Sequence, residues 1–173
     1  MAEAAVHSAS SRQDWQSLSH SPLGACASVT DYQKLHRIGE GTYGFVYKAV
    51  SRATGRTVAL KRIILHNEQQ DGFPLTSVRE LRILQACRHE NIVSLLEVAV
   101  GAKRDAVFLA FEYCDHDLHS LIHHASNKGA FPFSERQVKC LSLQLLSALE
   151  YLHGRFVVHR DVKLSNVLYT NRG

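Results

Sequence analysis

Hydrophobic and polar residues alternate over three segments in the first two thirds of the chain, as they do in half-buried β-strands. The segments are 45–50, 57–64 and 106–113. Turn-forming stretches at 53–56 and 102–105 provide the breaks between them. This half of the chain therefore predicts an antiparallel, β-rich unit.

One segment between these strands has the period of a helix instead. Residues 76–87 carry an apolar residue every three or four positions, which is typical of one buried helix face. Thr76 and Ser77 are candidate N-terminal caps, because their hydroxyl groups can accept hydrogen bonds from the first backbone amides of a helix. The apolar positions are Val78, Leu81 and Leu84, with Gln85 as the alternative to Leu84.

The last third of the chain is helical in pattern. Ser134 and Gln137 have the spacing of a capping box, and Gly154 is a typical residue after a helix C-terminus. Between them the apolar stripe is too wide for a one-sided surface helix, so we expect burial on more than one side. Short β-like runs follow at 156–159 and 167–170, and residues 170–173 resemble a hairpin turn. The apolar residues of the helix are Val138, Cys140, Leu141, Leu143, Leu145, Leu146, Ala148, Leu149 and Leu152.

The first 30 residues differ from the rest. They are rich in alanine and serine and lack hydrophobic periodicity, so we expect a disordered tail that ends where order begins, near Tyr32. No basic segment precedes an apolar core at the start, which argues against a secretory signal. No run approaches the eighteen or so apolar residues of a membrane span.

Composition narrows the function classes. The hydrophobic fraction of 45% and the charged fraction of 21% are ordinary for a globular protein. The net charge of +4 comes from scattered basic residues, so we expect neither a nucleic-acid partner nor a membrane partner. The cysteines form no C-x-x-C pair, which favours reduced thiols and a location in the nucleus or cytoplasm. They are Cys26, Cys87, Cys114 and Cys140.

The glycine-rich segment 39–44, GEGTYG, fits the pattern G-x-G-x-x-G. A dinucleotide site needs a helix after these glycines, but the β-rich residues 45–47 follow here. We therefore expect a strand–turn–strand hairpin whose glycines let the backbone lie close to phosphate groups. An ordinary hairpin turn is the alternative.

Lys61 and Glu80 could form a charged pair beside such a hairpin. Lys61 lies in the strand after the glycines and could hold the phosphates of a nucleotide, with Ala59 facing the same way. Glu80 in the following helix is the natural acidic partner of Lys61. The alternative interpretation makes Glu80 the capping-box partner of Ser77, and one conformation cannot satisfy both.

The motif HRDVKLSN, residues 159–166, carries the strongest chemical signal. Asp161 can accept the proton of an attacking hydroxyl, Lys163 can steady a transferred phosphoryl group, and Asn166 can bind a magnesium ion. Arg160 suits bidentate contact with a phosphate. The alternative interpretation is a polar loop that joins two strands and has no catalytic role. Glycine loop, strand lysine, helix glutamate and this loop rarely occur in this order by chance.

With these motifs in this order, residues 32–173 resemble a eukaryotic protein kinase. GEGTYG, PLTSVRE at 74–80 and YCDHDL at 113–118 are similar to the cyclin-dependent kinases, with the PITSLRE and PISSLRE branches closest. The resemblance implies an α+β, bilobal kinase fold. Its β-rich N-lobe with one helix would be complete at 31–111, and the hinge and a partial helical C-lobe would occupy 112–173.

The resemblance also implies a function and its residues. Because Lys163 follows Asp161 by two, the expected activity is transfer of the ATP γ-phosphate to serine or threonine of a protein substrate, with Mg²⁺. The partner would be a cyclin, bound through the segment Pro74–Leu84. The residues implied around ATP are Ile38, Gly39, Glu40, Gly41, Thr42, Tyr43, Gly44, Val46, Ala59, Lys61, Phe111, Glu112, Cys114 and Leu168. Thr42 and Tyr43 also match positions of inhibitory phosphates in relatives.

The chain departs from the family pattern in instructive places. Val162 and Leu164 replace the usual leucine and proline, which leaves the chemistry alone. D-F-G, the activation segment and A-P-E do not occur in the sequence. We therefore expect the 173-residue chain to be inactive by itself. The alternative function is a non-catalytic truncated product that binds a cyclin or a nucleotide.

A histidine-rich segment offers a rival chemistry. His119 and His123 are four residues apart, so on a helix both would face one side, as a zinc-binding pair requires. No third ligand follows at a persuasive spacing. Exposed helix histidines are the more common explanation, and we prefer it.

Overall fold

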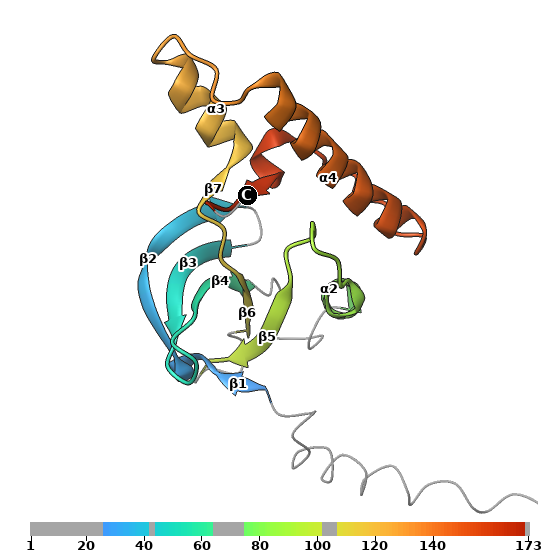
Figure 1. Ribbon diagram of the computed structural model, residues 1–173. Coiled ribbons are helices and arrows are strands. Elements are labelled where there is room, and N and C mark those ends of the chain that lie inside the picture. Colours follow the sequence, from blue (N-terminus) through green and yellow to red (C-terminus); the bar gives the residue numbers. More distant parts are fainter. Residues whose placement is uncertain (1–25, 42–43, 64–74, 102–106, 172–173) are drawn as a thin grey trace, which may run out of the picture.

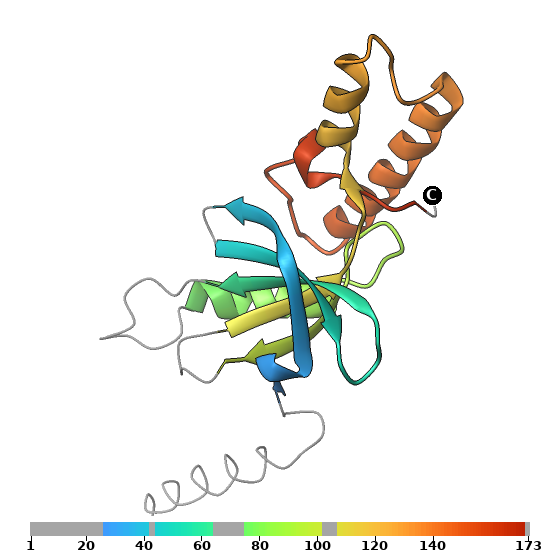
Figure 2. The same cartoon turned by 90° about the vertical axis from the view of Figure 1, so that its left-hand side faces the viewer.

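The computed structural model describes residues 26–41, 44–63, 75–101 and 107–171. Among these residues a curled β-sheet with one α-helix forms the first part, and two further α-helices form the second part (Figure 1). The view turned by 90° shows the helical part stacked on one end of the sheet (Figure 2). This is the predicted α+β arrangement of a β-rich N-lobe and a partial helical C-lobe.

The main sheet has six strands in the order β1-β5-β6-β4-β3-β2. Five of these strands pair in antiparallel fashion, and β1 pairs in parallel with β5. The three segments that alternate in hydrophobicity are strands, as predicted. The bounds are β1 Ala27–Ser28, β2 Tyr32–Gly41, β3 Gly44–Ser51, β4 Thr57–Ile63, β5 Leu95–Val100 and β6 Val107–Glu112.

Burial alternates along β4 and divides the sheet into two faces. Val58 and Leu60 are buried, whereas Ala59 and Lys61 are half-buried. Side chains two residues apart point to the same side of a strand, so Val58 and Leu60 face the core and the other pair faces the opposite side. The core cluster consists of Tyr32, Ala49, Val58, Leu60, Ala99, Phe108 and Ala110.

The N-terminal boundary differs from the prediction of a tail over residues 1–30. The strand β1 begins at Ala27, and a 3-10 helix, η1, spans Val29–Asp31 with Ser28 as its cap. The backbone of β1 finds its partners on β5, far away in the sequence, which local composition cannot reveal. Tyr32 then locks the start of β2 to β5, because its hydroxyl donates to the carboxylate of Glu97. Burial, and then the Glu97 carboxylate, raise the pKa of this phenol.

Helix α2, Leu75–Ala86, lies on the opposite side of the sheet from β2 (Figures 1 and 2). It begins before both candidate caps, so Thr76 and Ser77 lie in its first turn. The alternative that made Ser77 and Glu80 a capping box needs a helix that begins after Ser77, so this start argues against it. Its apolar stripe is partly buried as predicted and leads to the buried Cys87. The exposed side of the helix carries Arg79, Glu80, Arg82 and Ile83.

The helical part is built from α3, Leu118–Ser126, and α4, Glu135–His153. The predicted capping box is confirmed: the Gln137 amide donates to Ser134 Oγ (3.4 Å), and Gln137 Oε1 accepts from the Ser134 amide (2.8 Å). As predicted, the helix ends before Gly154, whose N–H donates to the carbonyls of Glu150 and Leu152. Asp117 caps α3 in the same manner through the Ser120 amide at 2.8 Å.

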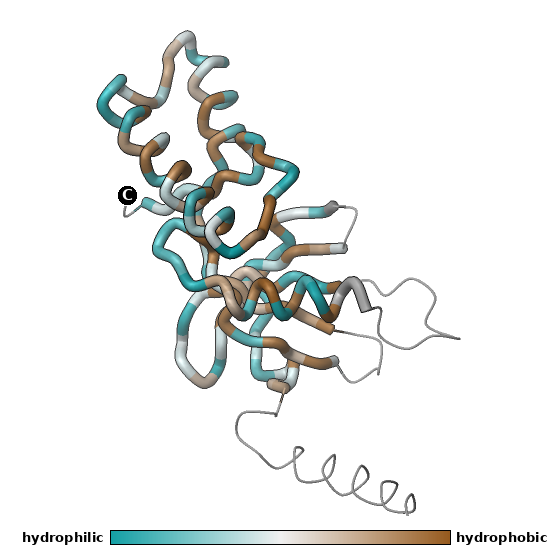
Figure 3. Tube along the Cα trace, turned by 90° about the vertical axis from the view of Figure 1, so that its right-hand side faces the viewer, coloured by the Kyte–Doolittle hydropathy of each residue, from teal (hydrophilic) through white to brown (hydrophobic). Residues whose placement is uncertain are grey.

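The wide apolar stripe of α4 is only partly covered among the described residues. Ala148 and Leu152 are buried, but Leu143 and Leu146 have exposed fractions of 58% and 60%. Figure 3 shows hydrophobic positions spread along both helices of this part. Burial on more than one side is therefore not seen here. No described helix is long and apolar enough to cross a bilayer.

Of the two β-like runs predicted after α4, only the second, at 167–170, contains a strand. Residues 156–159 form no strand, because a turn with Phe156 at φ 59° redirects the chain there. A 3-10 helix, η2, covers Leu164–Asn166. Strand β8, Leu168–Tyr169, pairs with β7, His116–Asp117, as a small second sheet. The predicted hairpin turn at 170–173 lies partly outside the described residues.

Candidate active site

The glycine-rich segment is a β-hairpin, as its sequence context predicts. Strands β2 and β3 are antiparallel and close with Gly41 opposite Gly44. Gly44 has φ 124°, which favours glycine because it has no Cβ atom. Gly39 lies opposite Val46, and Glu40 opposite Phe45. Thr42 and Tyr43, the predicted phosphorylation positions, lie outside the described residues.

The strand next to this hairpin presents the predicted lysine. Lys61 on β4 lies directly opposite Val46 on β3, and Ala59 lies opposite Phe111 on β6. Because this face is half-buried rather than buried, it can accommodate a ligand between apolar side chains and a positive charge. The predicted partner Glu80 is exposed on α2. Ion pairs between described residues do not include one that joins it to Lys61.

The segment from β6 into β7 is held firmly at its start. The Glu112 amide donates to the Ser94 carbonyl at 3.1 Å, and the Ser94 amide donates to Glu112 Oε1 at 2.6 Å. Two residues further, burial raises the pKa of the half-buried Cys114 thiol, and the charges of Glu112 and Asp115 add to this rise. This thiol therefore stays protonated and faces the site as a small neutral group.

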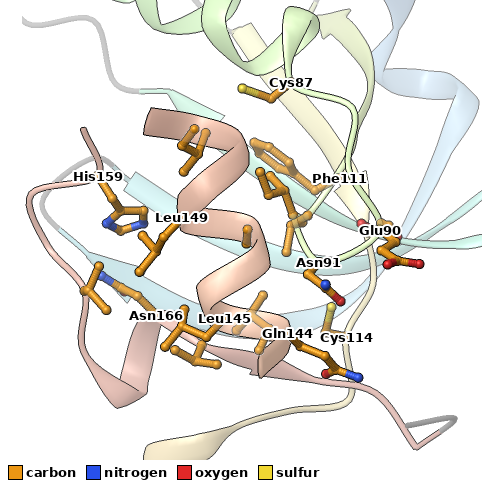
Figure 4. A pocket seen from close by; sticks show the side chains of 18 of the residues that line it. Cys87, Glu90, Asn91, Phe111, Cys114, Gln144, Leu145, Leu149, His159 and Asn166 are labelled. Carbon is orange, nitrogen blue, oxygen red and sulfur yellow. The ribbon is translucent and has the colours of Figure 1, made fainter. Parts of the chain in front are cut away.

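A cavity of about 550 Å³ lies between the sheet and the helical part. Figure 4 shows α4 running past Phe111, Cys114 and Asn166, which line this cavity from different elements. Side chains of α2 and of the α2–β5 loop close its other side. Six predicted site residues line it: Phe111, Glu112, Cys114, Lys163, Asn166 and Leu168.

The predicted residues outside this cavity lie mostly on the sheet, whereas Glu80 lies on α2 and Asp161 lies in the HRDVKLSN loop. Val46, Ala59 and Lys61 share one face of the strands, next to the glycine hairpin. Ile38 on β2 is partly open to solvent, with an exposed fraction of 43%. The structure thus forms two adjoining halves, one on the sheet and one between the lobes.

Three residues of the HRDVKLSN loop form one charged cluster. Asp161 Oδ2 accepts from Lys163 Nζ at 2.9 Å and from Asn166 Nδ2 at 2.9 Å. Asn166 Nδ2 also donates to the Asp161 carbonyl at 2.8 Å, and the Asp161 amide donates to His159 Nδ1 at 3.3 Å. The hydrogen bonds from Lys163 and then Asn166 lower the pKa of the Asp161 carboxyl group. Asp161 is therefore ionised and oriented at neutral pH.

The backbone of this loop is unusual. Among the described non-glycine residues, Phe156 (φ 59°) and Arg160 (φ 65°) have φ in the left-handed region. Such conformations are sparsely populated and are typical of functional loops, where surrounding contacts hold them. Arg160 is exposed next to Asp161, which leaves its guanidinium accessible to an anionic group. The side chain of Phe156 is 97% exposed.

A set of polar contacts that the sequence did not predict joins the two parts. The Arg88 amide donates to the Tyr151 hydroxyl at 2.8 Å, and the rings of His89 and Tyr151 lie 5.0 Å apart. His89 Nδ1 accepts from the Asn91 amide (3.1 Å), which leaves Nε2 protonated toward Ser147 Oγ at 3.3 Å. These contacts fix the α2–β5 loop on α4. No local sequence signal marks them, because their partners lie about sixty positions apart.

The histidine pair considered for zinc lies on helix α3. The rings of His119 and His123 on α3 stack with 6.1 Å between centroids, and both residues are exposed. His123 Nδ1 also lies 3.4 Å from Asn127 Nδ2. In the described part of the chain, no group of three or more histidine, cysteine or acidic side chains could hold a metal ion.

A β-rich lobe with a glycine hairpin and strand lysine, a hinge, and an Asp-x-Lys-x-x-Asn loop on a helical lobe together define the protein kinase class. The sequence model of the family "Protein kinase domain" matches residues 32–173. The chain therefore belongs to the protein kinase family, as its motifs predicted.

Individual relatives narrow the class further. The chain is 50% identical over 146 residues to probable cyclin-dependent kinase 10 of Dictyostelium discoideum, which covers 84% of this chain and 39% of that protein. It is 49% identical over 151 residues to human cyclin-dependent kinase 10 (87% and 41%). It is 46% identical over 151 residues to cyclin-dependent kinase G-2 of Oryza sativa subsp. indica (87% and 21%). The predicted resemblance to cyclin-dependent kinases is confirmed, and the chain spans about two fifths of the first relatives' length.

The charged cluster gives a direct prediction for Lys163→Met. Removing the ammonium group takes away the largest influence that lowers the pKa of Asp161, so this pKa should rise toward the ordinary aspartate value. The carboxyl carbon of Asp161, followed by NMR in a pH titration, measures the change. Lys139→Met on the exposed side of α4 is the matched control and should leave the Asp161 titration unchanged. An Asp161 pKa that is the same in Lys163→Met and in the unaltered chain would contradict the assigned cluster.

Proposed function

We propose that this chain carries the nucleotide-binding lobe and the catalytic loop of a serine/threonine protein kinase of the cyclin-dependent type. The reaction is transfer of the ATP γ-phosphate to a serine or threonine hydroxyl of a protein substrate. One observation supports this most strongly: Asp161, Lys163 and Asn166 form a single cluster beside a cavity that also reaches the hinge at Glu112 and Cys114.

The sheet and the hinge would bind the nucleotide. Val46 and Ala59 provide apolar surface for the adenine, and Lys61 on the same face provides positive charge for its phosphates. The Glu112 amide is already used by Ser94, so at this residue the carbonyl is the group for the adenine edge. Cys114 offers a second backbone position two residues further. These groups bind and orient without needing to titrate.

The catalytic loop would act on the substrate hydroxyl. A general base must be ionised at the working pH and must be held in position. Asp161 meets both conditions because Lys163 and Asn166 donate to its carboxylate. Lys163 has a side chain that is 55% exposed, so its ammonium can turn from Asp161 to a transferred phosphoryl group. The ammonium group of Lys163 would thus stabilise the Asp161 carboxylate first and the transferred phosphoryl group afterwards.

Asn166 fits the role of a metal ligand, but only as one donor. Its Nδ2 donates twice to Asp161, which leaves the amide oxygen Oδ1 as the hard ligand that Mg²⁺ prefers. Mg²⁺ usually takes one or two protein oxygens and completes its shell with phosphate oxygens and water. When bound, the ion neutralises phosphate charge during transfer. The described residues add no carboxylate beside Asn166 other than Asp161, which already accepts from Lys163.

A second candidate function is a non-catalytic chain that binds a cyclin or a nucleotide. The apolar surface of the described helical part favours it, because Leu143, Leu146 and Phe156 are all more than half exposed. Such a surface is rarely left in water by an independently stable domain. This candidate and the kinase differ in one measurable respect, which is whether phosphoryl transfer depends on Asp161.

The first functional prediction concerns Asp161→Asn. In a form of this protein that phosphorylates a peptide, the substitution should lower kcat by about 10²–10⁴-fold, because asparagine cannot accept the hydroxyl proton. ATP affinity, measured by calorimetry, should change little, since Asp161 is not among the residues assigned to adenine or phosphate binding. Asp115→Asn is the matched control, because it makes the same change on an exposed carboxylate near the hinge. Unaltered turnover in Asp161→Asn would refute the catalytic assignment.

We also propose that a cyclin docks on α2. Arg79, Arg82 and Ile83 share the exposed side of this helix, which gives a mixed apolar and cationic surface suited to a protein partner. Glu80 lies on the same helix and is exposed, so movement of α2 toward the sheet could bring its carboxylate to Lys61. The family resemblance implies such an ion pair in the active state.

A charge reversal tests this docking surface. Arg79→Glu should weaken cyclin co-purification several-fold, because a buried cation at a protein interface usually contributes more than an exposed one. Arg52→Glu in the exposed β3–β4 turn is the control and should have no effect on the same assay. Cyclin binding that tolerates substitutions along the whole exposed side of α2 would rule this surface out.

A further inference from the structure

Two cations project from the face of the main sheet that holds the core, away from the proposed nucleotide site. Lys34 lies two residues after the buried Tyr32 on β2, and Arg62 lies two residues after the buried Leu60 on β4. Side chains at this spacing share a face. Both Lys34 and Arg62 are exposed. The nucleotide face of β4 is the opposite one, which carries Lys61.

The ammonium group of Lys34 lies over two aromatic rings. Its Nζ lies 4.4 Å from the ring centroid of Phe108 and 5.1 Å from that of Tyr47. Phe108 is the direct cross-strand neighbour of Arg62, so the rings bring the two cations to the same end of the barrel-like sheet. A cation over aromatic faces is attracted by their negative potential and loses little freedom when it binds a ligand.

The positive charges of Lys34 and Arg62 repel each other. Partial burial, and then the positive charge of Arg62, lower the pKa of Lys34, and no carboxylate of the described residues counts among the causes of this shift. Glu97 is the acidic side chain nearest to Tyr32 on this face, and its carboxylate already accepts from the Tyr32 hydroxyl. Ion pairs among the described residues include neither Lys34 nor Arg62. An anion between these two cations would remove their mutual repulsion.

We propose that Lys34 and Arg62, supported by the rings of Tyr47 and Phe108, form a docking site for an anionic side chain of a protein partner. The ligand is a carboxylate or a phosphorylated hydroxyl, next to an apolar residue that contacts the half-buried Tyr47. Both anions suit a guanidinium beside an ammonium. The site binds rather than catalyses, and it is separate from the nucleotide face, so it does not rest on the proposed kinase activity.

A protein is favoured over the other polyanions. Nucleic-acid affinity depends on neutralising many phosphates along a strand, typically with a stripe of basic residues. Anionic membrane surfaces attract clusters of about four to eight basic side chains. Here only two cations lie beside one ring, that of Phe108, which suits a single anionic side chain in a peptide.

The test is peptide binding to the 173-residue chain, followed by fluorescence anisotropy. The probes are labelled Gly-Leu-phosphoserine-Leu-Gly, its glutamate counterpart and its unmodified serine counterpart. At least one anionic probe should bind, and the serine probe should not. Lys34→Met and Arg62→Met should each weaken binding by about tenfold or more, which is the usual effect of losing one charge-assisted contact. Which of the two anionic probes binds more tightly identifies the source of the anion.

Matched variants separate docking from unspecific attraction and from misfolding. Lys48→Met removes a lysine that also lies over a ring, 4.3 Å from the centroid of Tyr113, and should leave the affinity unchanged. Lys34→Arg keeps the charge and should retain binding. On peptide binding the pKa of Lys34, followed by NMR of its side chain, should rise because an adjacent anion favours the charged form. Equal binding of the serine probe, no binding of either anionic probe, or equal losses in Lys48→Met and Lys34→Met would overturn the proposal.

Discussion

The register of β4 between its two neighbours is the constraint on which the proposed site depends. Lys61 is opposite Val46, and Ala59 is opposite Phe111, because the backbone hydrogen bonds of three antiparallel strands fix these pairs. A slip by one residue would turn Leu60 to the nucleotide face and put Lys61 into the core. The core prevents this, since Val58 and Leu60 are almost fully buried and a charge there would cost far more than it returns. Burial of one face of β4 therefore places Lys61 on the opposite face, where the nucleotide would bind.

The second requirement is a connection between the sheet and the catalytic loop. The hinge provides the covalent one, and Ser94 holds it at Glu112 through two hydrogen bonds. The α2–β5 loop provides another, through the contacts of Arg88 and His89 with Tyr151 and Ser147 on α4. The same helix lines the cavity and ends just before the loop that carries Asp161. A shift of α2 would consequently move residues on the sheet side and on the α4 side of the cavity.

The sequence was sufficient where the determining interactions are local. The glycine hairpin, the strands and both ends of α4 followed from spacing, since glycine backbone freedom and capping bonds involve residues within a few positions. It failed where distant contacts decide. Strand β1 exists because of its pairing with β5, and α2 begins before Thr76 and Ser77, which removes the proposed cap. Residues 156–159 have strand-like composition but turn with Phe156 in a left-handed conformation.

In the candidate site, too, local features could be predicted from the sequence, whereas contacts between distant residues could not. The motif around Asp161 could be read from residue types, and its hydrogen bonds lie within five positions of one another. The contacts of His89 and Tyr151 could not, because neither residue has a motif and their partners come from different elements. Whether Lys61 meets Glu80 depends on the position of a whole helix, which residue spacing alone does not determine.

The central claim is that the sheet face and the catalytic loop are two halves of one nucleotide site. Amide hydrogen exchange of the chain, with and without ATP and magnesium, tests this most directly, because a ligand slows exchange wherever it stabilises the folded form. The account predicts added protection in three places at once: residues 38–46, the hinge at Cys114, and residues 161–168. Lys61→Met should weaken all three together. Protection confined to the sheet, or no protection at any ATP concentration, would contradict a single site.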